Sequence, residues 1–192
     1  VNAVDLELAT EDPDAFIQAA KLVATGFGGI NLEDIKAPEC FIIEQRLKAE
    51  LDIPVFHDDQ HGTAIISGAA LINALELAGK KIDEVKVVFS GAGASAIATA
   101  NHYVRLGANP KNLWFADSKG VISTKRDNLT PTKAMYAQDT DLETLAEAAV
   151  GADVLVGLSV GGMFTPEMVR SMADDPIVFA MANPDPEILP ED

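Results

Sequence analysis

The sequence predicts an α/β fold in which a doubly wound parallel sheet is preceded by part of a smaller α/β domain. Short apolar runs alternate with segments of helical length through most of the chain, and this alternation is typical of parallel sheets with helices on both faces. Glycine or acidic residues directly follow several of these runs. Because crossover connections lay consecutive strands parallel, we expect those residues to gather along one edge of each sheet.

Residues 1–61 carry the pattern of a strand–helix–strand unit that follows a first helix. The expected elements are a helix that begins at Asp12-Pro13 and ends at Gly26, a strand over 28–32, a helix over 38–51 and a strand over 54–57. An aspartate followed by proline is typical of a helix N-terminus, and glycine is typical of a helix end. We interpret residues 1–61 as part of a smaller α/β domain that precedes the doubly wound sheet.

Residues 62–192 contain four further apolar runs that read as buried strands. The expected elements are strands over 85–90, 113–116, 154–158 and 177–181, with helices over 62–78, 95–106 and 140–150 and one that starts at Thr165-Pro166. The helix over 62–78 has small and apolar residues all round, which predicts burial at a domain junction. Thr140 and Glu143 have the spacing of a capping box for the helix over 140–150. The domain boundary is therefore placed near His61.

A glycine-rich turn follows the strand over 85–90 and opens the next helix. Its sequence, Gly91-Ala92-Gly93-Ala94, begins a GxGxxA pattern in which the first glycine permits the tight turn and the second lets a pyrophosphate approach the backbone. The helix N-terminus adds N–H groups and a positive dipole. Asp117 ends the following strand, where an acid normally binds the adenine ribose. This context predicts a Rossmann-like dinucleotide-binding domain, and the alternative is a tight strand–helix turn of another α/β protein.

The segment Asp117-Ser118-Lys119 bears on which nucleotide is bound. An acid at the strand end favours NAD through the ribose hydroxyls. Ser118 and Lys119 have the hydroxyl and the charge to accept the 2′-phosphate of NADP, although a solvated lysine is an equal alternative. We therefore keep both nucleotides open, with a preference for NADP.

Two acidic pairs follow the two strands expected in residues 1–61. Glu33 and Asp34 come after the first strand, and Asp58 and Asp59 come after the second. Parallel pairing would bring these carboxylates to one rim, where their mutual repulsion is costly unless a cation or protons neutralise it. Carboxylate oxygens are the ligands that Mg²⁺ and Mn²⁺ prefer. The pattern predicts a divalent metal site with Glu33, Asp34 and Asp59 as ligands, and the alternative is a set of solvated loop and cap residues.

Four other polar side chains are candidate functional groups. His57 and His61 flank the second acidic pair and are more often hydrogen-bonded packing residues than catalysts in such a setting. Cys40 lies in an apolar helical stretch and is expected to be a small core residue. Asn183 follows the last strand, where it would face the nicotinamide and the substrate, and the alternative is an Asn-Pro turn.

Composition excludes several classes of partner. The chain of 192 residues carries a formal net charge of −16, which argues against nucleic acid because phosphate contacts need a basic face. No apolar run is long and clean enough to span a bilayer, and no signal peptide is seen at the start. A single cysteine rules out a disulfide framework and fits a reducing, cytoplasmic location.

Taken together, these segments resemble the malic enzyme family, the decarboxylating malate oxidoreductases, and in particular its bacterial-type members. The similarity runs through nearly all of the chain, and the matching segments are FGGINLEDI (27–35), VFHDDQHGTA (55–64), SGAGA (90–94), DSKG (117–120) and ANP (182–184). The second of these segments is highly specific for the family.

The resemblance implies roles for the matching residues. Glu33, Asp34 and Asp59 would bind Mg²⁺ or Mn²⁺, Asp58 would orient a catalytic lysine, and Asn183 would contact malate and the cofactor. The implied reaction is hydride transfer from malate to NAD or NADP, followed by loss of CO₂ and protonation of enolpyruvate. The resemblance also implies that residues 1–61 are the C-terminal part of a malate- and metal-binding domain. It further implies a homo-oligomer, with a dimer as the default.

The family's catalytic tyrosine and lysine have no counterpart among these residues and are expected upstream of Val1, so the chain reads as an internal segment. The Rossmann domain, residues 62–192, is likewise expected to be truncated at its C-terminus. We therefore expect the segment alone to lack turnover. Two other functions stay open: a malolactic enzyme, which would release lactate, and a catalytically inactive module that binds nucleotide and metal.

Overall fold

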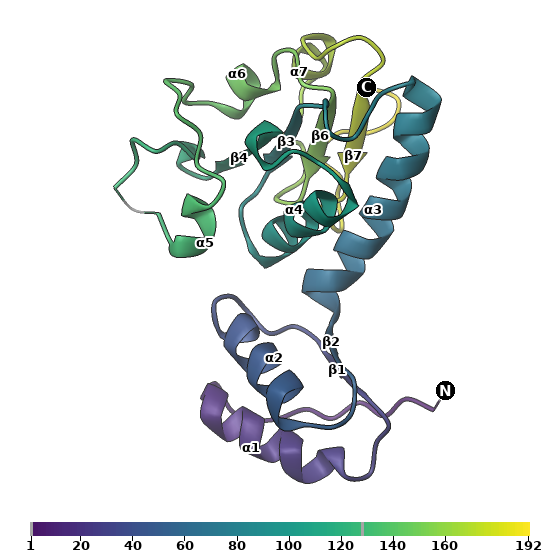
Figure 1. Cartoon of the computed structure of the whole chain (residues 1–192), viewed down its shortest axis with the longest axis vertical. Coiled ribbons are helices and arrows are strands. Elements are labelled where there is room, and N and C mark those ends of the chain that lie inside the picture. Colours follow the sequence, from purple (N-terminus) through teal and green to yellow (C-terminus); the bar gives the residue numbers. More distant parts are fainter. Residues whose placement is uncertain (1, 128) are drawn as a thin grey trace. The chain divides into compact units, whose positions relative to one another are not determined.

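The computed structural model describes residues 2–127 and 129–192, and the chain divides into two compact units. One unit ends at His61 and the other begins at Gly62. Figure 1 shows the elements of both units in chain order.

The first unit packs two helices against a two-stranded parallel sheet. Its elements are α1 (Pro13–Ala24), β1 (Ile30–Leu32), α2 (Glu39–Glu50) and β2 (Val55–His57). Strands β1 and β2 pair from Ile30 opposite Val55 to Leu32 opposite His57. The register places both acidic pairs directly after paired residues, because Glu33 follows Leu32 and Asp58 follows His57.

Helix α1 starts as the sequence predicts. The Asp12 carboxylate accepts a hydrogen bond from the Asp14 N–H at 3.0 Å, and Pro13 occupies the first helical position. The helix ends at Ala24 with Thr25 as its cap, two residues before the expected glycine. Ile17 on α1 packs against Leu47 of α2 in the buried cluster of this unit, so burial of apolar surface holds the two helices on the sheet.

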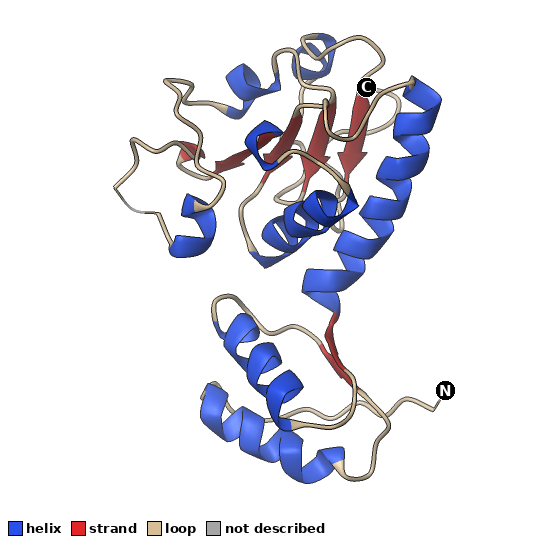
Figure 2. Cartoon of the chain, in the orientation of Figure 1, coloured by secondary structure: helices blue, strands red, loops and turns tan. Residues whose placement is uncertain are grey.

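The second unit is a five-stranded sheet with helices on both faces (Figure 2). Its elements are α3 (Asp58–Ala78, which starts within the first unit), β3 (Val87–Ser90), α4 (Ala94–Leu106), a 3₁₀ turn (Pro110–Asn112), β4 (Leu113–Asp117), β5 (Gly120–Val121), α5 (Pro131–Ala134), α6 (Leu145–Ala149), β6 (Val154–Gly157), α7 (Pro166–Arg170) and β7 (Ile177–Ala180). The strand order is β5-β4-β3-β6-β7. Strands β3, β4, β6 and β7 are parallel, and the short β5 is antiparallel to β4. The predicted fold class, a Rossmann-like doubly wound sheet, is confirmed.

Alternate residues of each central strand supply two separate buried clusters. Val87 and Phe89 of β3 lie in the cluster that α3 and α4 cover, whereas Val88 lies in the cluster that α6 covers. The Phe89 and Phe115 rings stack with their centroids 4.6 Å apart. Because both faces are covered, the strands read as continuous apolar runs, and this is why the sequence reveals them clearly.

Helix α3 differs from expectation at its start and on its surface. It begins at Asp58 rather than at residue 62, so Asp58 and Asp59 lie in its first turn and not in a loop. Acidic groups suit that position because they complement the positive end of the helix dipole. Burial is also one-sided: Leu71 is buried, whereas Ile66 and Leu77 are 67% and 90% exposed.

Helix α6 corrects the predicted capping box. The box is formed by Thr144 and Glu147, not by Thr140 and Glu143, and the helix is confined to Leu145–Ala149. Glu147 accepts hydrogen bonds from the backbone N–H groups of Thr144 and Glu143. Both threonine–glutamate pairs have the same spacing, so the sequence pattern alone could not choose between them.

The segment 118–138, expected as a loop, contains the short elements β5 and α5. Among the helices described in the structure, none is long and apolar enough to cross a lipid bilayer.

Candidate functional site

The glycine turn lies at the carboxyl end of β3, in the centre of the sheet. Gly91 has a φ of +111°, and a side chain there would bring a Cβ within 2.5 Å of the Leu158 carbonyl oxygen. Its N–H donates to the Ala116 carbonyl at 2.8 Å, so the turn is fastened to the end of β4. Only glycine fits both the backbone conformation and the close approach.

Gly93 is the N-cap residue of α4, and no side chain accepts a hydrogen bond from the first N–H groups of that helix. The residue adopts an extended conformation with φ −83°, and no side-chain hydrogen bond caps the helix. A Cβ on Gly93 would meet nothing within 4 Å. Gly93 is therefore not required by the packing of the chain itself, and the open space beside the helix N-terminus suits an anion such as a pyrophosphate.

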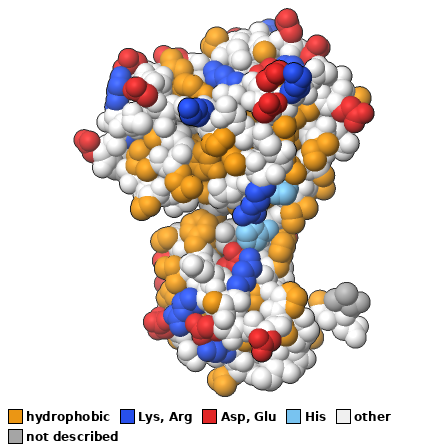
Figure 3. Space-filling view, in the orientation of Figure 1, with side chains coloured by type: hydrophobic (Ala, Val, Ile, Leu, Met, Phe, Trp, Pro, Cys, Tyr) orange, Lys and Arg blue, Asp and Glu red, His pale blue; other side chains and the backbone are white. Residues whose placement is uncertain are grey.

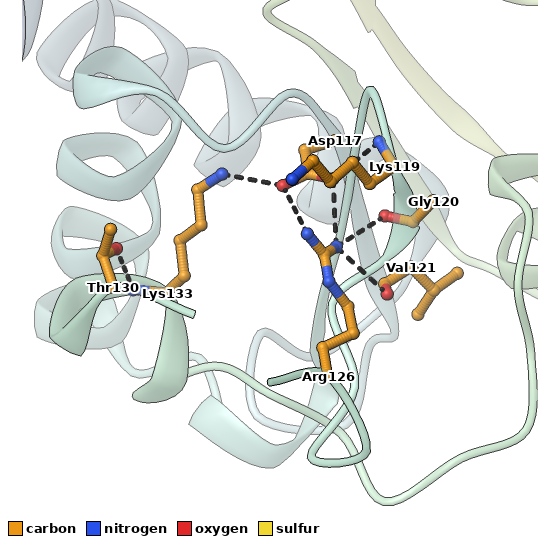
Figure 4. Close-up of polar contacts among 7 residues, drawn as sticks. All are labelled: Asp117, Lys119, Gly120, Val121, Arg126, Thr130 and Lys133. Carbon is orange, nitrogen blue, oxygen red and sulfur yellow. Dashed lines mark hydrogen bonds and ion pairs between the residues drawn. The ribbon is translucent and has the colours of Figure 1, made fainter. Parts of the chain in front are cut away.

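Two cationic side chains and one backbone N–H bind the Asp117 carboxylate at the end of β4 (Figure 4). Arg126 donates to both carboxylate oxygens, Nη1 to Oδ1 at 3.0 Å and Nη2 to Oδ2 at 3.1 Å. Lys133 Nζ donates to Oδ2 at 2.7 Å, and the Lys119 backbone N–H donates to Oδ1 at 2.9 Å. The Lys119 side chain is exposed beside them. We call Asp117, Lys119, Arg126 and Lys133 the Asp117 cluster.

The cluster holds Asp117 ionised. Partial burial by itself would raise the pKa of Asp117, but hydrogen bonds from Arg126, Lys133 and the Lys119 N–H outweigh it and hold the pKa well below its ordinary value. Two cations are paired with this carboxylate and the exposed Lys119 adds a third positive charge, so the cluster keeps a net positive charge at neutral pH. A carboxylate already occupied by a bidentate arginine is less able to accept ribose hydroxyls.

The remaining predicted cofactor residues lie at the same edge of the sheet. Ser118 is exposed in the turn between β4 and β5, and Ala92 and Ala94 flank Gly93 at the start of α4. Asn183 is exposed and follows β7, on the opposite side of β3 from Asp117. The sheet order therefore separates an Asp117 side from an Asn183 side, with the glycine turn between them.

The acidic residues of the first unit are only partly brought together. The Asp59 carboxylate accepts a hydrogen bond from the Asp34 backbone N–H at 3.0 Å, and Asp34 has a φ of 55°. Glu33 turns its Oε2 to the Asn31 side-chain amide at 2.6 Å. Within residues 2–127 and 129–192, no three histidine, cysteine or acidic side chains form a group that could hold a metal ion. The residues that follow β1 and β2 lie next to each other, as predicted. Metal binding by these residues stays a prediction.

The histidines and the cysteine of this unit are packing residues in the structure. His61 Nε2 lies 2.7 Å from the Glu44 carboxylate, and His57 is fully buried with Nδ1 accepting the Gln60 N–H at 3.3 Å. Burial raises the pKa of the Cys40 thiol, which makes its reactive thiolate form scarcer.

The opposite edge of the sheet carries charged residues that bind one another. A small depression there is lined by Gly79, Lys80, Lys81, Glu84, Val85 and Asp153. Lys80 Nζ is bound to the Asp153 carboxylate at 2.8 Å and to the Asp174 carbonyl at 2.6 Å. These groups satisfy one another, so they favour a structural role. Across the face drawn in Figure 3, basic and acidic side chains are intermixed despite the acidic total.

Two family models match the chain. The model described as malic enzyme, NAD binding domain, matches residues 60–191, and the model described as malic enzyme, N-terminal domain, matches residues 3–48. The chain belongs to the malic enzyme family.

Several curated malic enzymes are similar over the whole chain. An NADP-dependent malic enzyme of Halomonas elongata is 54% identical over 191 residues, an NAD-dependent malic enzyme of Rhizobium meliloti is 50% identical over 192, and a bifunctional malic/malolactic enzyme of Bacillus subtilis is 50% identical over 197. The chain spans 45%, 25% and 48% of these proteins, less than half of each.

A solved malic enzyme shows the same fold. The NAD-dependent malic enzyme of Thermotoga maritima is 43% identical and superposes with a TM-score of 0.89, covering 96% of this chain and 50% of that one. The Rossmann-like architecture of this chain is thus shared with a family member of known structure.

Sequence reasoning missed three residues of the sheet edge. Arg126 and Lys133 lie in a segment read as a loop, and the signal that could have found them is the positive charge that follows a strand-ending aspartate. Glu187 is fully buried although it lies near exposed residues at the end of the chain. No local pattern marks it, because its burial depends on the folded loops and one of its partners, the Ser159 N–H, is 28 residues away.

Replacing Asp117 by asparagine is expected to destabilise the chain in a pH-dependent way. The depressed pKa means that the stabilisation is fully present above the pKa of an unfolded aspartate, about 3.9, and is lost as the pH falls through the lower pKa of the folded state. Asp117→Asn should therefore lower the free energy of unfolding by about 1–3 kcal/mol between about pH 5 and pH 8, with the difference shrinking below about pH 4.

Denaturant unfolding across this pH range measures the difference. The matched control is Asp127→Asn, since Asp127 is an exposed aspartate of the same segment. A destabilisation by Asp117→Asn that grows as the pH falls would contradict the assignment.

Proposed function

We propose that the protein containing this chain oxidises malate with NADP⁺ or NAD⁺ and decarboxylates the product to pyruvate and CO₂, with the help of a divalent metal ion. The observation that carries the proposal is the carboxyl edge of the sheet, where an uncapped helix N-terminus and the positively charged Asp117 cluster lie together in a member of the malic enzyme family.

The nucleotide is expected to cross the sheet edge at the glycine turn. Gly91 fixes the turn, and Gly93 leaves space for the pyrophosphate beside the first N–H groups of α4. The adenosine half then lies toward β4 and the nicotinamide half toward β6 and β7. In this arrangement Asn183 lies on the nicotinamide side, where it would hold malate.

The donor set of the first unit fits a hard divalent cation in its chemistry. Glu33, Asp34 and Asp59 would hold the ion, and the hydrogen bond from the Asp34 N–H already fixes Asp59 next to the β1 rim. The bound ion would supply positive charge that polarises the C2 oxygen of malate and stabilises the enolate. Asp58, beside them in the first turn of α3, would orient a catalytic lysine.

The Asp117 cluster favours NADP over NAD. Arg126 and Lys133 donate hydrogen bonds to the Asp117 carboxylate, which makes it less able to accept hydrogen bonds from the ribose hydroxyls. The surplus positive charge, with Ser118 and Lys119 exposed beside it, suits a 2′-phosphate. Relatives of both nucleotide preferences exist, so the preference rests on this geometry.

A malolactic outcome is the second candidate, because one similar protein is described as bifunctional.

We also propose a homodimer, since α3 exposes the apolar side chains Ile65, Ile66, Ile72 and Leu77, and an apolar helix face of this kind is typical of interfaces.

The direct test of the function is malate turnover by the full-length protein. With Mn²⁺ and NADP⁺ or NAD⁺, we expect reduced nucleotide and pyruvate in equal amounts, and we expect EDTA to abolish both. Absorbance of the reduced nucleotide and chromatography of the acids measure the products. Lactate without net nucleotide reduction would favour the malolactic alternative, and binding without either product would favour an inactive module.

A valine at position 93 should separate nucleotide binding from folding. Because a Cβ on Gly93 meets nothing and its φ is ordinary, Gly93→Val should melt like the wild type yet lose nucleotide binding, since the side chain fills the pyrophosphate space. Gly91→Ala, in contrast, should lower the melting temperature because its Cβ meets Leu158. Calorimetric titration and thermal melting measure the two effects, and normal nucleotide affinity in Gly93→Val would contradict the site.

Removing a cation from the Asp117 cluster should weaken the binding of NADP⁺ more than the binding of NAD⁺. We expect Lys119→Ala and Lys133→Ala each to raise the Kd for NADP⁺ by roughly 10–100-fold, with a smaller effect on NAD⁺, because each loses a charge-assisted contact to the 2′-phosphate. The control is Lys125→Ala, an exposed lysine of the same segment that pairs with Asp141. Equal effects on both nucleotides would assign Asp117 to ribose binding and favour NAD.

A further inference from the structure

Glu187 is fully buried between the loops that follow β6 and β7. Glu187 Oε1 accepts the Ser159 N–H at 3.1 Å, and Oε2 accepts the Ala182 N–H at 3.0 Å. Across residues 2–127 and 129–192, no lysine, arginine or histidine forms an ion pair with it. Burying an unpaired carboxylate is costly, so its two backbone contacts must hold it in a defined place.

The same residue joins the two loops through its backbone and its packing. The Glu187 carbonyl accepts the Phe164 N–H at 3.0 Å, and the Pro186 carbonyl accepts the Gly162 N–H at 3.0 Å. The carboxylate fills the space beside β6, because a Cβ on Gly157 would lie 2.2 Å from Glu187 Cδ. Loop 158–164 and loop 181–187 therefore form one connected surface.

This surface adjoins the residues that are expected to hold the reacting groups. The Glu187 carboxylate accepts a hydrogen bond from the N–H of Ala182, which directly precedes Asn183. Ser159, whose N–H it also accepts, shares a hydrogen bond at 2.8 Å with Ser90, the residue before the glycine turn. One carboxylate thus links the Asn183 loop, through Ser159, to the turn that is expected to carry the pyrophosphate.

We propose that Glu187 is a positioning residue that sets the nicotinamide and malate side of the sheet edge by fixing Asn183 and Ser159 relative to the glycine turn. The assignment of that side to nicotinamide and malate rests on the proposed function. The Asp117 side lies across β3 and does not depend on Glu187, so the two halves of a bound nucleotide are affected differently.

The test variant is Glu187→Gln, which keeps the size of the side chain but turns an amide NH₂ toward one of the two backbone N–H groups. We expect kcat/KM for malate in the full-length protein to fall by about 10–100-fold, because small misplacements of binding groups have effects of that order. Binding of adenosine 2′,5′-bisphosphate, which probes only the Asp117 side, should change by less than about twofold, as expected for independent sites. Glu191→Gln, at an exposed glutamate, is the matched control.

A double-mutant cycle distinguishes positioning from general support of the fold. If Glu187 acts through Asn183, Glu187→Gln should have little further effect on kcat/KM in an Asn183→Ala background. Independent, additive effects of the two substitutions would overturn the proposal. So would an unchanged kcat/KM, or an equal loss of adenosine bisphosphate binding.

The proposal is also tested without malate turnover. The ratio of NADPH affinity to adenosine 2′,5′-bisphosphate affinity isolates the nicotinamide side, and Glu187→Gln should lower it. If the wild type does not oxidise malate, the proposed function fails while this ratio still decides on Glu187. If Glu187→Gln does not fold, Glu187→Asp is measured in the same way, and unfolding of both variants would mark Glu187 as structural only.

Discussion

The parallel pairing of β3 with β4 and β6 is the constraint on which the rest of the second unit depends. Parallel neighbours end at the same edge, so the residues after each strand meet there although they are distant in sequence. Gly91 makes this edge tight, since its N–H binds the end of β4 while its Cα approaches the Leu158 carbonyl. Side-chain bulk at that residue would push apart the three strand ends that form the site.

The edge divides into two parts of opposite character. On the β4 side, the Asp117 carboxylate is bound by the Arg126 and Lys133 side chains and by the Lys119 backbone N–H. The surplus charge is positive, and the Lys119 side chain is exposed. On the β6 and β7 side, the buried Glu187 accepts hydrogen bonds from the Ser159 and Ala182 backbone N–H groups, so it organises loops rather than attracting ligands. A dinucleotide that crosses this edge would meet an electrostatic subsite at one end and a subsite of fixed shape at the other, which matches the different needs of a phosphate and a reacting ring.

The sequence predicted what local patterns encode. Central strands such as Val87–Ser90 were recognisable because both of their faces are buried, and the glycine turn because φ and close approach demand glycine at residue 91. The predicted helix boundaries were wrong where contacts in the folded chain determine them. Helix α3 begins earlier, at Asp58, and α6 is capped by Thr144 rather than Thr140. Arg126, Lys133 and Glu187 were missed because charged residues in connecting segments are usually solvated, and only the folded arrangement supplies their partners.

The most direct test is a crystal structure of the full-length protein with NADP⁺ and Mn²⁺. We predict the pyrophosphate at the N-terminus of α4 beside Gly93, the 2′-phosphate within hydrogen-bond reach of Lys119 or Lys133, and the nicotinamide on the side of Asn183. A nucleotide bound at the opposite edge of the sheet, near Lys80 and Asp153, or one whose adenosine lies toward β7, would contradict this prediction.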